Sequence, residues 1–213
     1  MIKSFIHFPT LLALTFIIFT AATTPDKATE ILASSRTSLE ALEDLSADFQ
    51  YGISHPGTRS VIRKGTVKYM PEDHFVLSFE NEAIYCDGKT IWINEFDGPV
   101  VIRDFEPEEG VNIKKMFEVY NAKAEPRYDG LEKVHGLKCH KIFLNLKDPN
   151  LDYSQAYLWI NTGNDLPEKV VMIDRRQTRT TFEFMSTKTD LGFSQADFRY
   201  QVPNGKKIID ERY

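Results

Sequence analysis

The side chains in this sequence best suited to catalysis or metal binding are its histidines and cysteines, and their spacing favours neither. Beyond the first 22 residues the histidines are His55, His74, His135 and His140. No His-Glu-x-x-His or Cys-x-x-Cys pattern occurs. Cys139 and His140 are adjacent, but neighbouring residues of a strand point to opposite faces and do not easily chelate one ion. The sequence therefore predicts no metal site and no cofactor.

Motifs for nucleophilic or phosphate chemistry are missing as well. The sequence contains no Gly-x-Ser-x-Gly elbow, no phosphate-binding glycine loop and no dinucleotide fingerprint. The carboxylate pairs Glu108-Glu109 and Asp210-Glu211 could serve acid-base catalysis, but such pairs in polar loops are more often solvated charges. We therefore expect a protein that is not an enzyme.

Two cysteines, Cys86 and Cys139, leave two possibilities open. An oxidising compartment would let them form a disulfide if their Cα atoms came within ~6 Å of each other. Cys86 precedes a predicted turn at Asp87-Gly88 and Cys139 begins a later predicted strand, so both lie near strand ends. Two separate buried thiols are the alternative, because sequence alone does not pair cysteines.

The N-terminal segment has the pattern of a secretory signal peptide. Lys3 precedes an apolar stretch over residues 5–19, and small residues follow at Ala21 and Ala22. A membrane anchor is the alternative, but Pro9 interrupts a run that is shorter than the ~20 residues needed to span a bilayer. We expect cleavage after Ala22 and, in a bacterium, a soluble periplasmic protein.

The remaining residues, 23–213, suit one globular domain. The whole chain of 213 residues is 42% hydrophobic and 27% charged, which argues against disorder. Lysine and arginine total 26 against 31 aspartates and glutamates, so no overall basic excess attracts nucleic acid. We expect a monomer that does not bind nucleic acid.

The hydrophobic periodicity predicts a helix followed by an antiparallel sheet. Apolar residues recur at helical spacing over residues 27–44. The clearest strand alternates Phe75, Leu77 and Phe79 with more polar neighbours, which indicates one buried face. Asp87-Gly88 predicts a tight hairpin. Later strands are predicted over residues 138–146, 155–161, 168–174, 179–186 and 198–202.

One stretch interrupts the strand pattern. Residues 111–123 place Ile113, Met116, Phe117 and Tyr120 at helical spacing, with charged residues between them. This pattern predicts a short amphipathic helix between strands.

The order of these segments resembles a known family. The predicted N-terminal helix is followed by Leu45-Ser46-Ala47-Asp48-Phe49-Gln50, a strand opens with Gly65, and Asp87-Gly88-Lys89-Thr90-Ile91-Trp92 comes later. Near the end of the chain, residues 196–205 finish in Pro203-Asn204-Gly205. These segments resemble LolA, the periplasmic outer-membrane lipoprotein carrier family, over nearly the whole mature chain.

The resemblance implies a mainly β fold with a few helices: an incompletely closed antiparallel β-barrel, or half-barrel, covered by the N-terminal helix and a helical lid. Its concave side would be a hydrophobic cavity for acyl chains. The lid would consist of the four apolar residues of 111–123. The residues expected to line the cavity are Leu39, Phe49, Phe75, Leu77, Phe79 and Trp92.

The implied function is lipoprotein transport: a chaperone-like carrier that ferries the acyl chains of lipoproteins, or a related lipid, from an inner-membrane donor complex to an outer-membrane acceptor. One departure from the family stands out. Well-studied carriers have an arginine before a proline in the second strand that latches the lid, whereas this chain has Tyr69-Met70-Pro71. The alternative function is a periplasmic lipid-responsive sensor or regulator with the same half-barrel.

Overall fold

The computed structural model describes residues 26–106, 119, 122–149 and 151–212. Two sequence predictions fall outside these ranges. They are the signal peptide of residues 1–22 and the lid residues Ile113, Met116, Phe117 and Tyr120. No helix formed by the described residues is both long and apolar enough to cross a bilayer.

The described chain begins with helix α1 (Lys27–Glu40) and continues into a single sheet. The strands are β1 (Leu45–Ser54), β2 (Val61–Met70), β3 (His74–Phe79), β4 (Glu82–Asp87), β5 (Thr90–Glu95), β6 (Val100–Asp104), β7 (Ala124–Val134), β8 (Leu137–Leu146), β9 (Tyr153–Asn161), β10 (Pro167–Asp174), β11 (Arg179–Thr189) and β12 (Ile208–Asp210). A short 3-10 helix, η1 (Gln195–Phe198), lies between β11 and β12.

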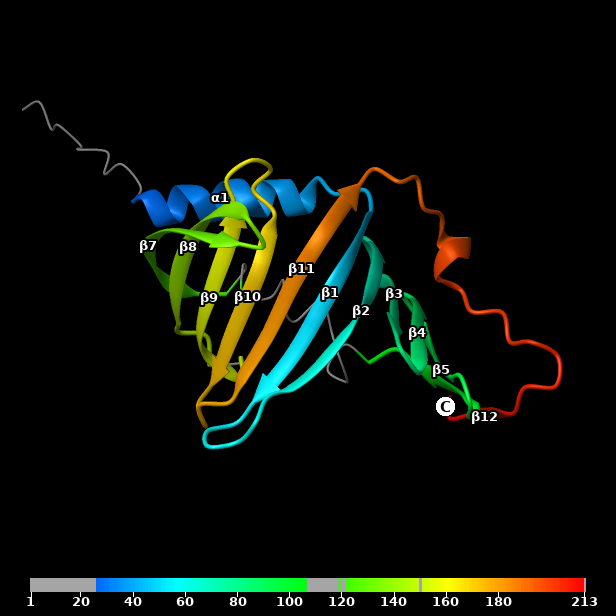
Figure 1. The fold of residues 1–213 in the computed structure, drawn as a ribbon. Helices are drawn as coiled ribbons and strands as arrows, with labels where there is room; N and C mark the ends of the chain where they lie inside the picture. The colour runs from blue at the N-terminus through cyan, green and yellow to red at the C-terminus, as the bar shows by residue number, and fades with distance from the viewer. Residues whose placement is uncertain (1–25, 107–118, 120–121, 150, 213) are drawn as a thin grey trace, which may run out of the picture.

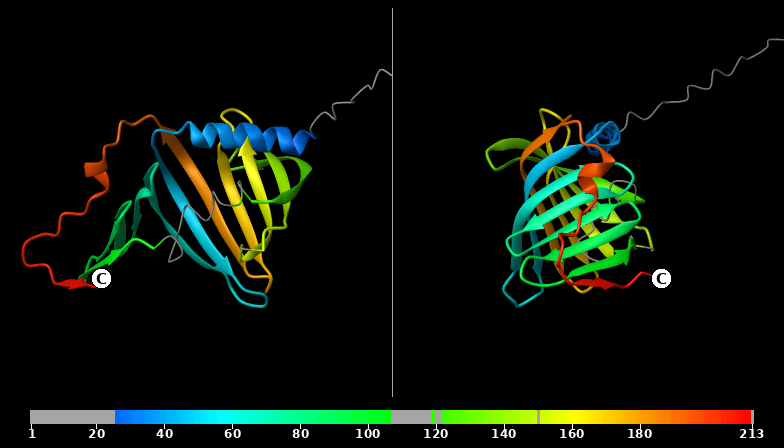
Figure 2. Two further views of the ribbon diagram at one scale, coloured as in Figure 1. Left: turned by 180° about the vertical axis from the view of Figure 1, so that it is seen from behind. Right: turned by 90° about the vertical axis from the view of Figure 1, so that its right-hand side faces the viewer.

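The sheet is open and strongly curled (Figures 1 and 2). The strand order is β12-β6-β5-β4-β3-β2-β1-β11-β10-β9-β8-β7, so β12 and β7 are the two edges of the described sheet. All neighbours pair antiparallel except β12 and β6, which are parallel. Helix α1 lies across one end of the sheet, beside β7 to β11 (Figure 1). The predicted half-barrel is therefore confirmed as an open, mainly antiparallel sheet.

Helix α1 begins at a side-chain cap and ends earlier than predicted. The carboxylate of Asp26 accepts hydrogen bonds from the backbone N–H groups of Ala28 and Thr29, at 2.7 and 3.2 Å. The predicted end near Asp44 is wrong, because the helix stops at Glu40. Asp44 is instead buried, and its carboxylate accepts hydrogen bonds from the N–H groups of Leu191 and Phe193, at 2.7 and 2.9 Å.

These bonds predict an acid-dependent contribution of Asp44 to stability. Burial pushes the pKa of Asp44 upward, but N–H groups of the 191–193 segment outweigh it and lower the pKa below its ordinary 3.8. We expect Asp44→Ala to lower the free energy of unfolding by about 2 kcal/mol, because two N–H groups lose their acceptor. Because the folded-state pKa is lowered, this contribution is complete above the ordinary pKa and is lost as pH falls through the folded-state value.

Urea unfolding at neutral pH and below pH 3.8 measures this effect. The difference between the parent and Asp44→Ala should shrink at the lower pH. Glu43→Ala is the control, since Glu43 is the exposed neighbour on the same turn. An equal loss for both variants would contradict the role of Asp44.

Most strand predictions are confirmed, with bounds that differ by a few residues at some ends. The Asp87-Gly88 hairpin is confirmed too: Gly88 has φ +82°, and the Asp87 carboxylate accepts hydrogen bonds from the N–H groups of Lys89 and Thr90. The strand predicted over residues 198–202 is wrong. Phe198 ends η1 and is fully buried, and the terminal strand is β12 further along.

The two cysteines are free and buried, so of the two possibilities the structure has separate buried thiols and no disulfide between Cys86 and Cys139. Six strands separate β4 from β8 in the sheet order. The thiols also belong to different clusters: Cys86 packs with the main core, and Cys139 packs with Trp159, Val171 and other residues of a separate cluster. The geometry therefore keeps the two sulfur atoms apart.

This arrangement predicts two inert thiols. Burial raises the pKa of Cys86 to about 12 and that of Cys139 to about 11, so neither forms the reactive thiolate near neutral pH. We expect a thiol-reactive dye at pH 8 to label neither cysteine in the folded protein. After denaturation without reductant it should label both. Denatured protein that takes up no dye until it is reduced would show a disulfide instead.

Candidate functional site

The candidate site is the inner, concave face of the curled sheet. Residues paired across neighbouring strands share a face, so the register defines this surface row by row. One row joins Ala47, Val67 and Leu77, and another joins Phe49, Gly65 and Phe79. Leu77 is also opposite Ile84 of β4. These rows belong to one large apolar cluster, which we call the inner-face cluster.

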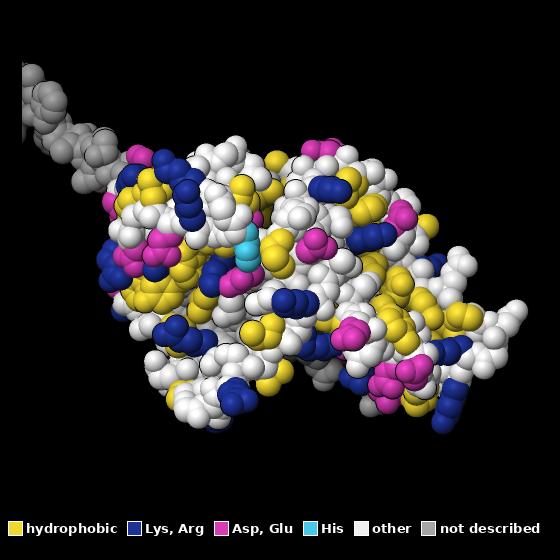
Figure 3. Space-filling model, in the orientation of Figure 1, with side chains coloured by type: hydrophobic (Ala, Val, Ile, Leu, Met, Phe, Trp, Pro, Cys, Tyr) yellow, Lys and Arg dark blue, Asp and Glu magenta, His cyan; other side chains and the backbone are white. Residues whose placement is uncertain are grey.

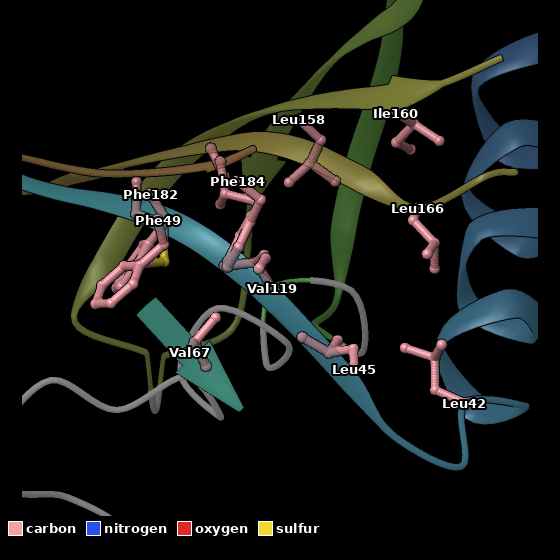
Figure 4. Close-up of a cluster of buried hydrophobic side chains, with 14 of the residues drawn as sticks. Leu42, Leu45, Phe49, Val67, Val119, Leu158, Ile160, Leu166, Phe182 and Phe184 are labelled. Atoms are coloured by element: carbon pink, nitrogen blue, oxygen red, sulfur yellow. The ribbon is translucent and has the colours of Figure 1, made fainter. Parts of the chain in front are cut away.

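The inner-face cluster extends over both halves of the sheet and reaches α1. Its buried members include Phe182 and Phe184 of β11 and Leu158 of β9. Figure 4 shows these side chains with Val119, which is also buried in the cluster, near Phe184. Ile31, Leu32 and Leu39 of α1 pack against it, partly buried. The result is a continuous apolar surface beneath the helix.

The structure brings together five of the six side chains predicted to line the cavity. Phe49, Phe75, Leu77 and Phe79 are buried in the inner-face cluster, and Leu39 packs against it. The rings of Phe49 and Phe79 meet edge to face with 5.5 Å between centroids. These side chains fill the core closely, and none of them lines either pocket described below.

Trp92 lies on the opposite face. Its register partners are Tyr85 and Ile102, whereas the neighbouring row of Ile84 and Ile93 is continuous with Leu77 of the inner face. Trp92 is buried in a separate cluster with Val100 and Ile102. Tyr85, Tyr200 and Val202 pack against this cluster. The C-terminal segment thus packs over Trp92, and the prediction that this residue lines the cavity is wrong.

An apolar pocket of about 220 Å³ opens where α1 meets the sheet. Its lining residues are Thr29, Leu32, Ala33 and Arg36 of α1, Ala124 and Pro126 of β7, Leu144 of β8, and Val119 and Ala122. Leu144 and Val119 belong to the inner-face cluster, so the pocket borders that surface directly. It is smaller than the ~300 Å³ at which small-molecule sites usually begin.

Helix α1 covers this face through small side chains. The only α1 residues that are fully buried are Ala28 and Ser35, and the larger Leu32 and Leu39 remain partly exposed. The hydroxyl of Ser35 is buried with no hydrogen-bond partner among the described residues, which costs about 1–3 kcal/mol. At the start of the helix, the ammonium group of Lys27 lies 4.0 Å from the ring centroid of Tyr128. The helix is therefore held by modest contacts.

A second, larger pocket of about 860 Å³ has a different character. It lies beside η1, and its lining includes Glu72, His74, Asp87, Lys89 and Arg199. His74 is buried, and its Nδ1 atom is 2.9 Å from the carbonyl oxygen of Pro71. Charges of both signs line this pocket, so it does not suit an acyl chain.

The inner face offers apolar contact rather than catalysis. Among the described residues, no group of three or more His, Cys, Asp or Glu side chains is placed to hold a metal ion. Cys86, the thiol of the inner-face cluster, is protonated near neutral pH because burial raises its pKa. At the rim of the cluster, the guanidinium of Arg63 lies 3.7 Å from the ring centroid of Phe79 and pairs with Glu82.

Sequence reasoning missed most of the pocket lining. Ala124 and Pro126 belong to β7, whose alternation is mainly between charged and small residues, so no apolar pattern indicated this strand. Leu32 and Leu144 were both inside predicted elements. Nothing in the sequence indicated that they would meet across the gap between α1 and the sheet.

Similarity to known proteins was found among solved structures and not among sequences. No family model matches the sequence, and no curated protein matches it. An uncharacterized conserved protein from Thermus thermophilus has a similar structure, with a TM-score of 0.54 and 14% identity over 87% of this chain and 99% of that one. LprF from Mycobacterium bovis has a TM-score of 0.53 and 14% identity over 84% and 97%. A LolA superfamily protein from Nitrosomonas europaea has a TM-score of 0.44 and 11% identity over 81% and 97%.

The two structures with TM-scores above 0.5 share their fold with this chain, and at 14% identity they carry no ligand or partner over to it. The likeness to these two structures is one of fold alone, and membership of the LolA-like family stays a prediction from the sequence. The helical lid that the resemblance implied falls on residues 107–118 and 120–121, outside the described ranges.

Proposed function

We propose that this protein is a carrier that binds the acyl chains of a lipid or lipoprotein against the inner face of the sheet, beneath α1. The observation that supports this most strongly is the apolar pocket at the border between α1 and the inner-face cluster. An apolar pocket gives up dispersion contacts when it is empty, and a ligand restores them. Its lining has one charged side chain, that of Arg36.

The size of the pocket implies that α1 moves when cargo binds. A volume of about 220 Å³ is below the usual range for ligand sites, so a long chain requires more space than the pocket offers. Separating α1 from the sheet exposes the fully buried Ala28 and Ser35 and the partly buried apolar side chains of the helix. The acyl chain would then replace the contacts that the helix gives up.

This exchange accounts for reversible binding. Burial of an acyl chain is worth ~0.8 kcal/mol per methylene, so complete enclosure of a sixteen-carbon chain would give on the order of 12 kcal/mol. A carrier has to release its cargo. The cost of moving α1, together with incomplete enclosure, offsets part of this gain and lets a partner with better enclosure accept the chain.

The remaining parts of the proposal follow from the sequence. The mature protein, residues 23–213, acts as a single-domain monomer in the periplasm after removal of the signal peptide. It carries acylated cargo from an inner-membrane donor to an outer-membrane acceptor without a covalent step. It is a carrier and not an enzyme.

Titration of the mature protein with a fluorescent sixteen-carbon fatty acid tests the proposal. We expect saturable binding of one probe per chain, displaced by an unlabelled sixteen-carbon fatty acid but not by butyrate, because apolar burial grows with chain length. Absence of saturable binding by the folded protein, or equal displacement by butyrate, would refute an acyl-chain site.

A further inference from the structure

Two neighbouring hairpins form a basic tip at the end of the sheet away from α1 (Figure 1). One is the β1–β2 hairpin, residues 55–60, and the other is the β10–β11 hairpin, residues 175–178. Because β1 pairs with β11, Ser54 is opposite Arg179 and the two hairpins lie side by side. His55 Nδ1 and Thr178 Oγ1 are 3.2 Å apart, which joins the hairpins.

The charge of this tip is opposite to that of the whole chain. With the strand residues next to the two hairpins, the tip comprises residues 55–62 and 174–179. It contains four exposed arginines and one acidic residue, whereas the chain has a net charge of −5. The arginines are Arg59, Arg175, Arg176 and Arg179. Among the residues that the structure describes, none of these arginines forms an ion pair with a carboxylate outside the tip.

The single acid of the tip, Asp174, is occupied by its own turn. Its Oδ1 atom accepts hydrogen bonds from the N–H groups of Arg176 and Thr178, at 2.8 and 2.7 Å. The turn is thereby fixed with Arg175 and Arg176 exposed. The arginines are therefore presented to solvent with little local compensation.

Exposed apolar side chains accompany the arginines. Val61 is 68% exposed and Ile62 is 53% exposed, the two highest values among the large hydrophobic residues that the structure describes as exposed. Both begin β2, directly after the hairpin that holds Arg59. In Figure 3 the lower tip of the molecule carries dark-blue and yellow side chains together.

We propose that this basic tip docks on a bilayer surface that contains anionic head groups. Arginines bind anionic head groups, and Val61 and Ile62 enter the boundary between head groups and acyl chains. A bilayer surface can surround a projecting tip, so that the arginines and the two apolar side chains contact it together. The proposal rests on the tip itself and goes beyond the carrier function, because it does not depend on what the inner face binds.

Flotation of the mature protein with vesicles tests this directly. We expect binding to an equimolar mixture of phosphatidylglycerol and phosphatidylcholine at low salt, and little binding to phosphatidylcholine alone. Each arginine contributes about fivefold to such affinity, so Arg175→Glu with Arg176→Glu should weaken binding by at least about 25-fold. Val61→Ser with Ile62→Ser should weaken it too, and should make the remaining binding easier to remove with salt.

The matched control reverses two charges in another exposed hairpin of the same sheet. Lys133 and Lys138 face each other across the β7–β8 hairpin, beside the exposed Leu131 and Leu137. Lys133→Glu with Lys138→Glu changes the net charge equally and should leave vesicle binding within about twofold of the parent, since these lysines lie outside the tip.

Three results would overturn the docking proposal. They are an absence of binding to the anionic vesicles at low salt, equal binding by the parent and the arginine variant, and an equal loss in the lysine control. The first of these results together with binding of acidic proteins would assign the tip to a protein partner instead. The fatty-acid titration of the same preparations is independent, so failure of docking and failure of the carrier function are distinguishable.

Discussion

Gly65→Ala is expected to lower the free energy of unfolding by about 3 kcal/mol or more, the largest loss of stability we predict. Gly65 lies between Phe49 and Phe79 in the pairing of β1, β2 and β3. A Cβ atom at this position would overlap the backbone carbonyl of Ser78 and approach the Phe49 ring to 3.2 Å. A backbone oxygen in a paired strand cannot move aside without disturbing the sheet.

Gly52→Ala provides the matched control for this prediction. Gly52 is also a strand glycine, but the nearest atom to its added Cβ would be 3.7 Å away, an ordinary contact. We expect Gly52→Ala to change the free energy of unfolding by less than about 0.5 kcal/mol. Urea denaturation of both variants measures the difference. Similar stability for the two would mean that the inner-face cluster is packed less tightly at Gly65 than the structure indicates.

Ala33→Trp is expected to reduce acyl-chain affinity at least about tenfold with little effect on folding. Ala33 is on the exposed side of α1 but lines the pocket at its border with the sheet. An indole ring here would occupy the mouth of a pocket of about 220 Å³. Because no buried side chain is removed, the free energy of unfolding should stay within about 0.5 kcal/mol of the parent.

Ser34→Trp separates blockage of the pocket from a general effect of the tryptophan. Ser34 is the next residue of α1, is exposed, and does not line the pocket. We expect this variant to bind the fluorescent fatty acid like the parent. If both tryptophan variants bound like the parent, acyl chains would not enter through this pocket. If both lost binding equally, the effect would not be specific to the pocket.

The parts of the fold that could be predicted from sequence are strands in which large apolar residues alternate along the chain. The single buried face expected for β3 is wrong, because Val76 and His74 on its other face are buried as well. Phe75, Leu77 and Phe79 alternate with residues of the other face, and the pattern places them correctly on one side of β3. The same reasoning fails for β7, where Pro126 and Tyr128 alternate with charged residues and the edge strand buries little. Near the C-terminus, the apolar Phe198 suggested a strand, but its ring is buried by contacts with His74 and Phe193 and not by strand pairing.

The prediction for Trp92 is wrong because a family resemblance does not fix the register of a hairpin. The two-residue turn after Asp87 pairs Cys86 with Ile91 and Tyr85 with Trp92. Since strand neighbours alternate between faces, Trp92 had to share a face with Tyr85 and not with Cys86. The pocket under α1 was beyond sequence reasoning, because it depends on how closely Ala28 and Ser35 let the helix approach the sheet.

Native mass spectrometry of the mature protein, purified from its own host without detergent, is the most direct test of the carrier hypothesis. We expect a fraction of the parent protein to carry one acylated lipid or lipopeptide per chain, identified after extraction into organic solvent. Ala33→Trp from the same host should lack this adduct, whereas Ser34→Trp should retain it. Parent protein that shows only the mass of the bare polypeptide, with no acyl chains in the extract, would contradict the proposed function.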